Sequence, residues 1–93
     1  MSTSQAQAVA PPVETLVSEV VATLAFAARA YLGDTKGDTK EEKQPDFAAA
    51  DLAIGIAAHA FEAVQSRLRA EDRSALQGML TDLRLTYVKK RGV

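Results

Sequence analysis

The sequence predicts a single domain with an all-α fold, either a three-helix bundle or a long helical hairpin. Three segments carry large apolar residues at three- and four-residue steps, the spacing that places side chains on one face of a helix. Alanine, the strongest helix former, supplies 18 of the 93 residues and leaves 26 larger apolar side chains to build a core.

The first helix is expected at about residues 12–32. Residues 1–11 are small and polar without periodicity, and we expect a mobile N-terminal tail there. Pro12 suits the first turn of a helix, where a missing N–H costs nothing. An apolar stripe then runs from Val13 to Leu32, and Gly33 is placed to end the helix in a left-handed conformation.

A flexible polar loop is expected at residues 33–45. It contains the tandem repeat Gly-Asp-Thr-Lys-Gly-Asp-Thr-Lys and no side chain that could join a core. Pro45 ends the loop, and Asp46 is suited to be the N-cap of the next helix.

The second helix, expected at about residues 46–68, has the most informative pattern. Large residues recur at seven-residue steps, and mostly small ones follow three positions later, which is a heptad repeat. The seam consists of Phe47, Ala50, Ile54, Ala57, Phe61, Val64 and Leu68. A second apolar strip, which includes Leu52 and Ile56, makes the apolar face wider than one neighbouring helix needs. We expect close packing by a neighbour to account for Gly55 in mid-helix.

The third helix is expected at about residues 71–90. Glu71 and Asp72 suit its positive N-terminal end, and an apolar stripe leads from Leu76 to Tyr87. Between residues 67 and 70 the sequence has no glycine, proline or strong cap. The second and third helices are therefore either separate or one bent helix.

Short motifs occur at the ends of the first and third helices. The first reads Thr23-Leu24-Ala25-x-x-Ala28-x-x-x-Leu32-Gly33, and the second reads Leu80-x-Asp82-Leu83-Arg84-x-x-Tyr87-Val88. A polar loop and an Asp51-Leu52-x-x-Gly55 helix lie between them. Over about residues 13–88 the chain thus resembles a small bacterial family known as domain of unknown function 1844. That family usually has a Thr-Pro-Glu-Glu turn before its last helix, which this chain lacks. The resemblance implies an all-helical fold and no assigned activity.

The residue types argue against an enzyme. The chain has no cysteine, which excludes a thiol nucleophile and cysteine-based metal sites. His59 is the single histidine, so it has no second nitrogen ligand. The five glycines form neither a phosphate-binding loop nor a dinucleotide fingerprint. We therefore expect no catalytic residue, no cofactor and no metal site.

Charge is distributed unevenly along the chain, although the net charge is only −1. Residues 67–93 have seven basic and three acidic side chains, whereas residues 1–66 have four and nine. The basic end of the third helix predicts an alternative function, contact with nucleic acid or another polyanion. The residues concerned are Arg84, Lys89, Lys90 and Arg91. Cations at the C-terminus of a helix are also favoured by the helix dipole alone.

The sequence also favours a cytoplasmic chain that does not enter a membrane. It has neither the pattern of a signal peptide nor a charge-free apolar run of about 20 residues. Glu14 and Glu19 argue against binding of the first helix to an anionic lipid surface.

The leading functional prediction is a small protein-interaction module that forms a homo-oligomer, taken as a dimer, and binds a further protein of unknown identity. Ordering the chain costs about 1.5 kcal/mol per residue, which 26 large apolar side chains barely offset in a lone copy. A second copy would supply the missing burial. The expected interface on the second helix consists of Phe47, Ile54, Ala57, Phe61, Val64 and Leu68.

Overall fold

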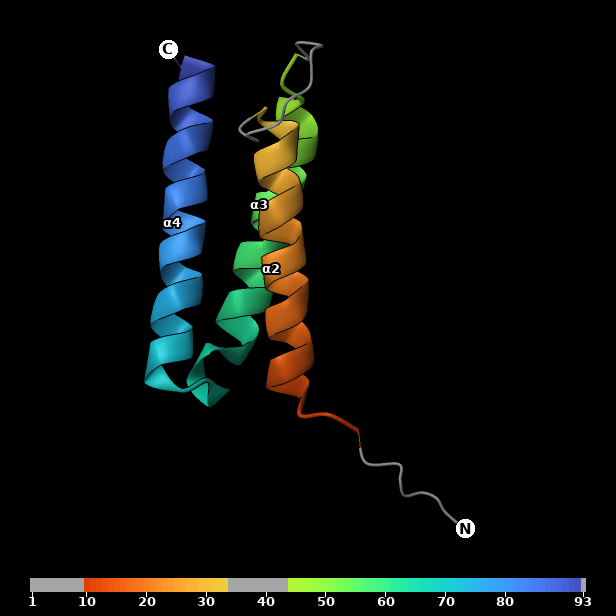
Figure 1. Ribbon diagram of the computed structural model, residues 1–93, viewed down its shortest axis with the longest axis vertical. Coiled ribbons are helices and arrows are strands. Elements are labelled where there is room, and N and C mark those ends of the chain that lie inside the picture. The colour runs from red at the N-terminus through yellow and green to blue at the C-terminus, as the bar shows by residue number, and fades with distance from the viewer. Residues whose placement is uncertain (1–9, 34–43, 93) are drawn as a thin grey trace.

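The computed structural model describes residues 10–33 and 44–92. They form three long helices and one 3-10 turn, α2 (Val13–Tyr31), α3 (Phe47–Val64), η1 (Gln65–Arg67) and α4 (Ala70–Gly92), which confirms the predicted all-α, three-helix class (Figure 1). Most of the predicted tail, residues 1–11, and most of the predicted loop, residues 33–45, lie outside the described residues.

α2 and α3 form an antiparallel pair, and at one end of the pair a backbone hydrogen bond joins the end of α2 to the residue before α3. The Asp46 N–H donates to the Tyr31 carbonyl at an N···O distance of 2.8 Å. Gly33 follows α2 with a φ of +78°, which is the predicted left-handed cap. The Asp46 carboxylate accepts a 3.0 Å hydrogen bond from the Ala49 N–H, which is the predicted N-cap of α3.

α3 and α4 are separate helices, which decides between the two alternatives that the sequence allows. After η1, Leu68 takes an extended conformation, and its carbonyl accepts a 3.1 Å hydrogen bond from Nη2 of Arg73. The Leu68 side chain is buried at this turn. The chain therefore reverses without glycine or proline, because a buried side chain and an arginine hold the turn.

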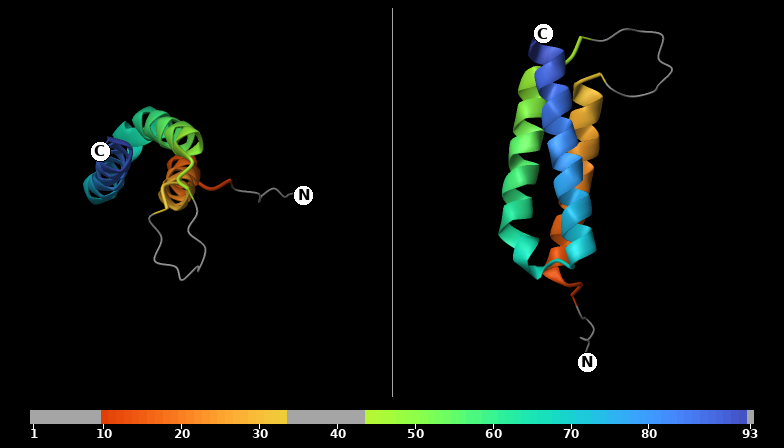
Figure 2. Two further views of the ribbon diagram at one scale, coloured as in Figure 1. Left: turned by 90° about the horizontal axis from the view of Figure 1, so that it is seen from above. Right: turned by 90° about the vertical axis from the view of Figure 1, so that its left-hand side faces the viewer.

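Figure 2 shows how the three helices are arranged, and the core consists of two clusters of buried residues contributed by all three of them. One cluster surrounds Phe61, Val64 and Leu76, and the other surrounds Ile54, Ala28 and Leu83. Five alanines are buried where α2 and α3 meet, and such small side chains allow two helix backbones to approach closely. These are Ala25, Ala28, Ala50, Ala53 and Ala57.

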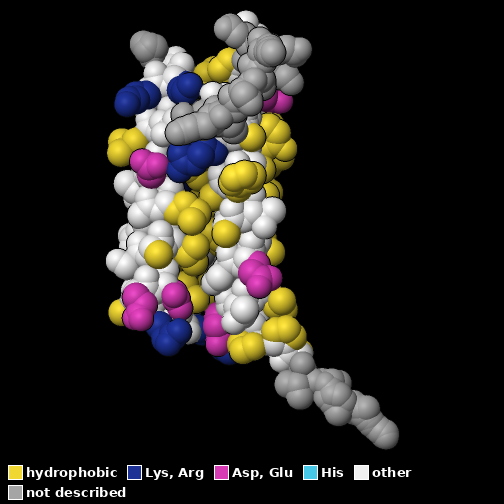
Figure 3. Space-filling view, in the orientation of Figure 1, with side chains coloured by type: hydrophobic (Ala, Val, Ile, Leu, Met, Phe, Trp, Pro, Cys, Tyr) yellow, Lys and Arg dark blue, Asp and Glu magenta, His cyan; other side chains and the backbone are white. Residues whose placement is uncertain are grey.

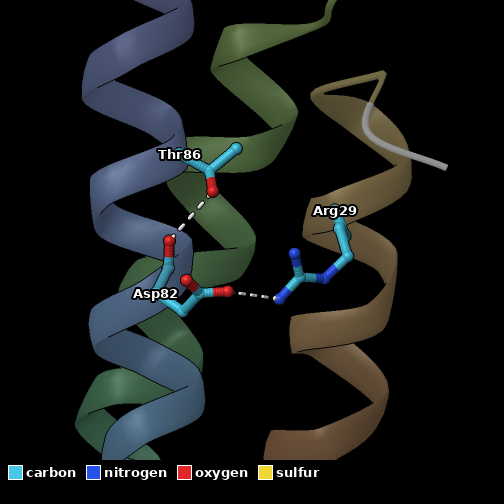
Figure 4. A network of polar contacts seen from close by, with 3 residues as sticks. All are labelled: Arg29, Asp82 and Thr86. Atoms are coloured by element: carbon cyan, nitrogen blue, oxygen red, sulfur yellow. Dashed lines mark hydrogen bonds and ion pairs between the residues drawn. The ribbon is translucent and has the colours of Figure 1, made fainter.

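An ion pair at the surface joins α2 to α4. Nη2 of Arg29 lies 3.1 Å from Oδ2 of Asp82, and the Thr86 hydroxyl donates to the Asp82 carbonyl at 3.0 Å (Figure 4). Both partners of the ion pair are partly exposed, so the pair contributes little to stability and mainly sets the relative position of the two helices.

Candidate interaction surface

The structure places the predicted interface seam in the core of the single chain. Five of its six predicted residues are at most 8% exposed: Ile54, Ala57, Phe61, Val64 and Leu68. They pack with α2 and α4 residues such as Val21, Leu76 and Leu83. The interface prediction is therefore wrong at these five positions, because side chains covered by their own chain cannot contact a second copy. The heptad marks a packing seam, but the helices that fill it belong to the same chain.

The sixth predicted residue, Phe47, contacts α4 at the start of α3 and is partly buried. Its ring meets the Tyr87 ring edge-on, with the centroids 5.8 Å apart and the ring planes at 86°. Phe47 therefore also makes a contact within the chain, and it identifies the side of α3 that is turned toward α4.

α2 has an uncovered apolar strip beside the core. Four large side chains of this strip are 41–48% exposed: Val13, Leu16, Val20 and Tyr31. Thr23 and Ala27 continue it at the same helical spacing. The sequence pattern alone does not separate this strip from the covered residues of α2, such as the buried Val21 and the partly buried Val17, because both sets fall at three- and four-residue steps.

α3 has a second uncovered strip, which the sequence pattern had separated from the seam. Leu52 is 66% exposed and Ile56 is 48% exposed. Ala49, Ala60 and Ala63 lie on the same side of the helix and are only partly covered or exposed. This is the part of the wide apolar face of α3 that its own chain leaves open.

The two strips form one surface on the side of the α2–α3 pair that is turned away from α4. Arg29 identifies the α4 side of α2, and Phe47 identifies the α4 side of α3. By helical spacing, the buried residues of each helix lie between this marker residue and the uncovered strip. Both strips therefore lie on the side away from α4. We call this surface the α2–α3 face. It consists of Val13, Leu16, Val20, Thr23, Ala27, Tyr31, Ala49, Leu52, Ile56, Ala60 and Ala63.

The α2–α3 face has no charged residue. Ten of its eleven side chains are apolar and the other is Thr23. Isolated exposed apolar residues are ordinary on a protein surface, whereas the largest contiguous apolar patch of a small protein is often a functional surface. Depletion of charge is also the compositional mark of interface cores.

Gly55 of α3 does not pack closely against a neighbouring helix. An added Cβ at Gly55 would meet no described atom within 4 Å. The expectation that a neighbouring helix packs closely on Gly55 is therefore wrong within the described chain.

The predicted polyanion-binding residues lie on the exposed C-terminal half of α4. Arg84, Lys89, Lys90 and Arg91 are all exposed, and the guanidinium of Arg91 stacks 5.6 Å from the centre of the Tyr87 ring. Arg84 and Arg91 are seven residues apart and share one side of the helix, whereas Lys89 and Lys90 point elsewhere. The four cations therefore do not form a single basic face.

A cleft of about 500 Å³ separates the N-terminal halves of α2 and α4. Leu68, Leu76 and Ala22 contribute apolar walls, and acidic and basic side chains surround them. Figure 3 shows hydrophobic side chains along the line between the two helices. At one end Nε of Arg67 donates a 3.0 Å hydrogen bond to Oε1 of Glu14, and this bond lowers the pKa of Glu14.

The described residues were compared with the clusters of side chains that hold metal ions. No group of three or more His, Cys, Asp or Glu side chains gathers among these residues. His59 is exposed on α3, three residues after Ile56 and four before Ala63, at the edge of the α2–α3 face.

By length and composition alone, one segment of the described residues, Phe47–Arg67, is long and apolar enough to cross a membrane, with a mean hydropathy of 1.5. A third of that window is buried inside the chain.

The fold and its surface define a small all-α protein with an uncovered apolar face on two of its helices. Residues 14–89 match the family model described as Domain of unknown function (DUF1844), and the chain belongs to this family. The resemblance noted in the sequence is thereby confirmed. Comparison with curated proteins and with solved structures found no match.

Proposed function

We propose that the protein is a helical interaction module that associates with a second copy of itself through the α2–α3 face. The observation that carries the proposal is the exposure of six large apolar side chains on one uncharged surface of two helices. These are Val13, Leu16, Val20, Tyr31, Leu52 and Ile56, at 41–66% exposure.

The size of the face is close to what a small dimer requires. A large aliphatic side chain offers about 60–120 Å² of apolar surface, so six that are half exposed leave on the order of 300 Å² open per copy. The alanines between them add to this area. A standard interface buries roughly 800 Å² per partner, of which about 60% is apolar. The face therefore supplies most of the apolar area of such an interface.

The proposal is tested by measuring the molar mass in solution and its response to one charge. Light scattering should show a species of twice 9.9 kDa at micromolar concentration. Leu52→Lys should raise the dissociation constant at least about tenfold, because dimerisation would then bury an unpaired ammonium group.

The matched control for Leu52→Lys is Leu85→Lys. Leu85 is 62% exposed on α4, away from the α2–α3 face, so the same substitution should leave the dimer unchanged. A 9.9 kDa species at high micromolar concentration would contradict the proposal, as would equal effects of the two substitutions.

The alternative, binding of nucleic acid by the end of α4, is less well supported because its four cations surround the helix. Cations there also interact favourably with the negative end of the helix dipole. Fluorescence anisotropy with labelled DNA and RNA at low ionic strength tests this alternative. Binding that weakens steeply with salt and disappears in Lys89→Glu would favour it.

A further inference from the structure

We propose that the second copy docks on the α2–α3 face in one orientation, with the two-fold axis parallel to the helices. α2 of each copy then packs against α3 of its partner, and four helices enclose a new core. This inference rests on the proposed self-association and adds the pairing of the helices to it.

Two contacts within the chain show which residues of α2 and α3 lie at the same height. Glu14, near the start of α2, is bonded to Arg67 just after α3. Tyr31, at the end of α2, is bonded to Asp46 just before α3. Between these two contacts the chain advances 17 residues along α2 and 21 along α3 and η1, so the residue numbers of a pair add to 81 at one end and to 77 at the other. We pair the positions between them in reverse order at the mean register, in which the two numbers add to about 79.

Five levels of the face, each a height along the helix axes that one α2 residue and one α3 residue share, pair a larger side chain with a smaller one; the level of Val13 has no α3 partner within the face. Near both ends the large side chain belongs to α2, and in the middle it belongs to α3. The level pairs, in order along α2, are Leu16 with Ala63, Val20 with Ala60, Thr23 with Ile56, Ala27 with Leu52, and Tyr31 with Ala49.

A two-fold axis parallel to the helices keeps every level in place and exchanges α2 for α3 across the interface. Each large side chain then meets a small one at every level. Leu16 faces the partner's Ala63, and Leu52 faces the partner's Ala27. The face is therefore complementary to itself in this orientation, and its surfaces can approach to the density of a protein interior.

A two-fold axis perpendicular to the helices gives a poorer fit. It places α2 against the partner's α2 in reverse, so that Leu16 approaches the partner's Tyr31 and Ile56 lies against the partner's Ile56. Ala63 then faces the partner's Ala49. Large side chains collide while gaps open between alanines, and both effects destabilise a packed interface.

The middle level distinguishes the two orientations by disulfide formation. The chain has no native cysteine, so Thr23→Cys and Ile56→Cys can each be made as the single thiol of the protein. The two variants are mixed in equal amounts and oxidised, and the covalent dimers are weighed by mass spectrometry. A disulfide forms only where the Cα atoms come within about 7 Å.

The proposed orientation brings position 23 of one copy to position 56 of the other. The mixture should therefore yield several-fold more heterodimer than homodimer, and each variant alone should yield little covalent dimer. Leu85→Cys mixed with Ile56→Cys is the control, because Leu85 lies on α4 outside the face; this pair should not be enriched in heterodimer.

The outcomes separate the orientation from the association itself. Abundant homodimers from each variant alone, together with a dimeric mass in light scattering, would overturn the parallel axis and leave self-association standing. A dimeric mass with no enrichment of heterodimer over the Leu85→Cys control would also overturn the orientation. A monomeric mass without covalent dimers would overturn both proposals.

Discussion

Nε of Arg67 donates a 3.0 Å hydrogen bond to Oε1 of Glu14, which joins the turn after α3 to the first turn of α2. The bond lies at the open end of the antiparallel pair, opposite the Asp46–Tyr31 bond at its other end. The register between α2 and α3, on which the α2–α3 face depends, is therefore held at both ends.

The Glu14–Arg67 bond predicts a pH-dependent stability. It lowers the pKa of Glu14 below the ordinary value of 4.5. A carboxyl group whose pKa is lowered by folding stabilises the native state above its unfolded pKa, and this contribution is lost as the pH falls through the folded pKa. We expect Glu14→Gln to be less stable than the native chain at pH 7, with the difference shrinking below pH 4.5.

Urea unfolding at a series of pH values measures this difference. Glu19→Gln is the matched control, because it removes the same charge from α2 without removing the bond to Arg67. A stability difference between Glu14→Gln and the native chain that stays constant from pH 7 to pH 3 would contradict the prediction.

Truncation of two phenylalanines should change the stability to very different extents. Phe61 is 6% exposed in the core, and Phe61→Ala should lower the free energy of unfolding by about 3–5 kcal/mol. Phe26 is 74% exposed on α2, and Phe26→Ala should change it by less than about 0.5 kcal/mol. Chemical denaturation checks both values. Similar losses in the two variants would mean that the assignment of the core is incorrect.

Substitution of two glycines by alanine should change the stability in opposite directions. Gly55 lies within α3 with open space where a Cβ would be, so Gly55→Ala should raise the stability by roughly 0.5–1 kcal/mol. Gly33 has a φ of +78°, so Gly33→Ala should lower it by about 1–2 kcal/mol. Thermal unfolding gives both changes, and a destabilised Gly55→Ala would show that a contact forms there in solution.

The N-cap of α3 offers a local test. Asp46→Ala removes the hydrogen bond to the Ala49 N–H and should cost about 0.5–2 kcal/mol. Asp51→Ala, a change of the same residue type at an exposed position inside α3, is the control and should cost less. The prediction would be contradicted by equal losses of stability in the two variants.

The features that could be predicted from the sequence are those that local chemistry determines. Gly33 and Asp46 end and begin helices for reasons contained in a few neighbouring residues, and both predictions are confirmed. The break after α3 could not be predicted, because it depends on the burial of Leu68 and on a bond from Arg73, which is five residues away.

The location of the open face could be predicted only in part. The heptad correctly identifies Phe61 and its neighbours as a packing seam, but periodicity does not say whether the packing partner is the same chain or another. The width of the apolar face of α3 indicated the open surface better, since Leu52 and Ile56 lie outside the seam and remain uncovered. On α2, buried and uncovered rows are adjacent, so Val20 and Val21 are separated only when the position of α3 is known.

α4 is attached to the rest of the molecule by a small part of its length. Of its 23 residues, only Leu76, Leu80 and Leu83 are buried, whereas α3 buries six of 18. Detachment of α4 exposes its three buried leucines and the α3 residues that they cover, but it leaves the contacts between α2 and α3 in place. In native-state hydrogen exchange, the amide protons of α4 should be replaced before those of the hairpin, through an opening well below the energy of global unfolding.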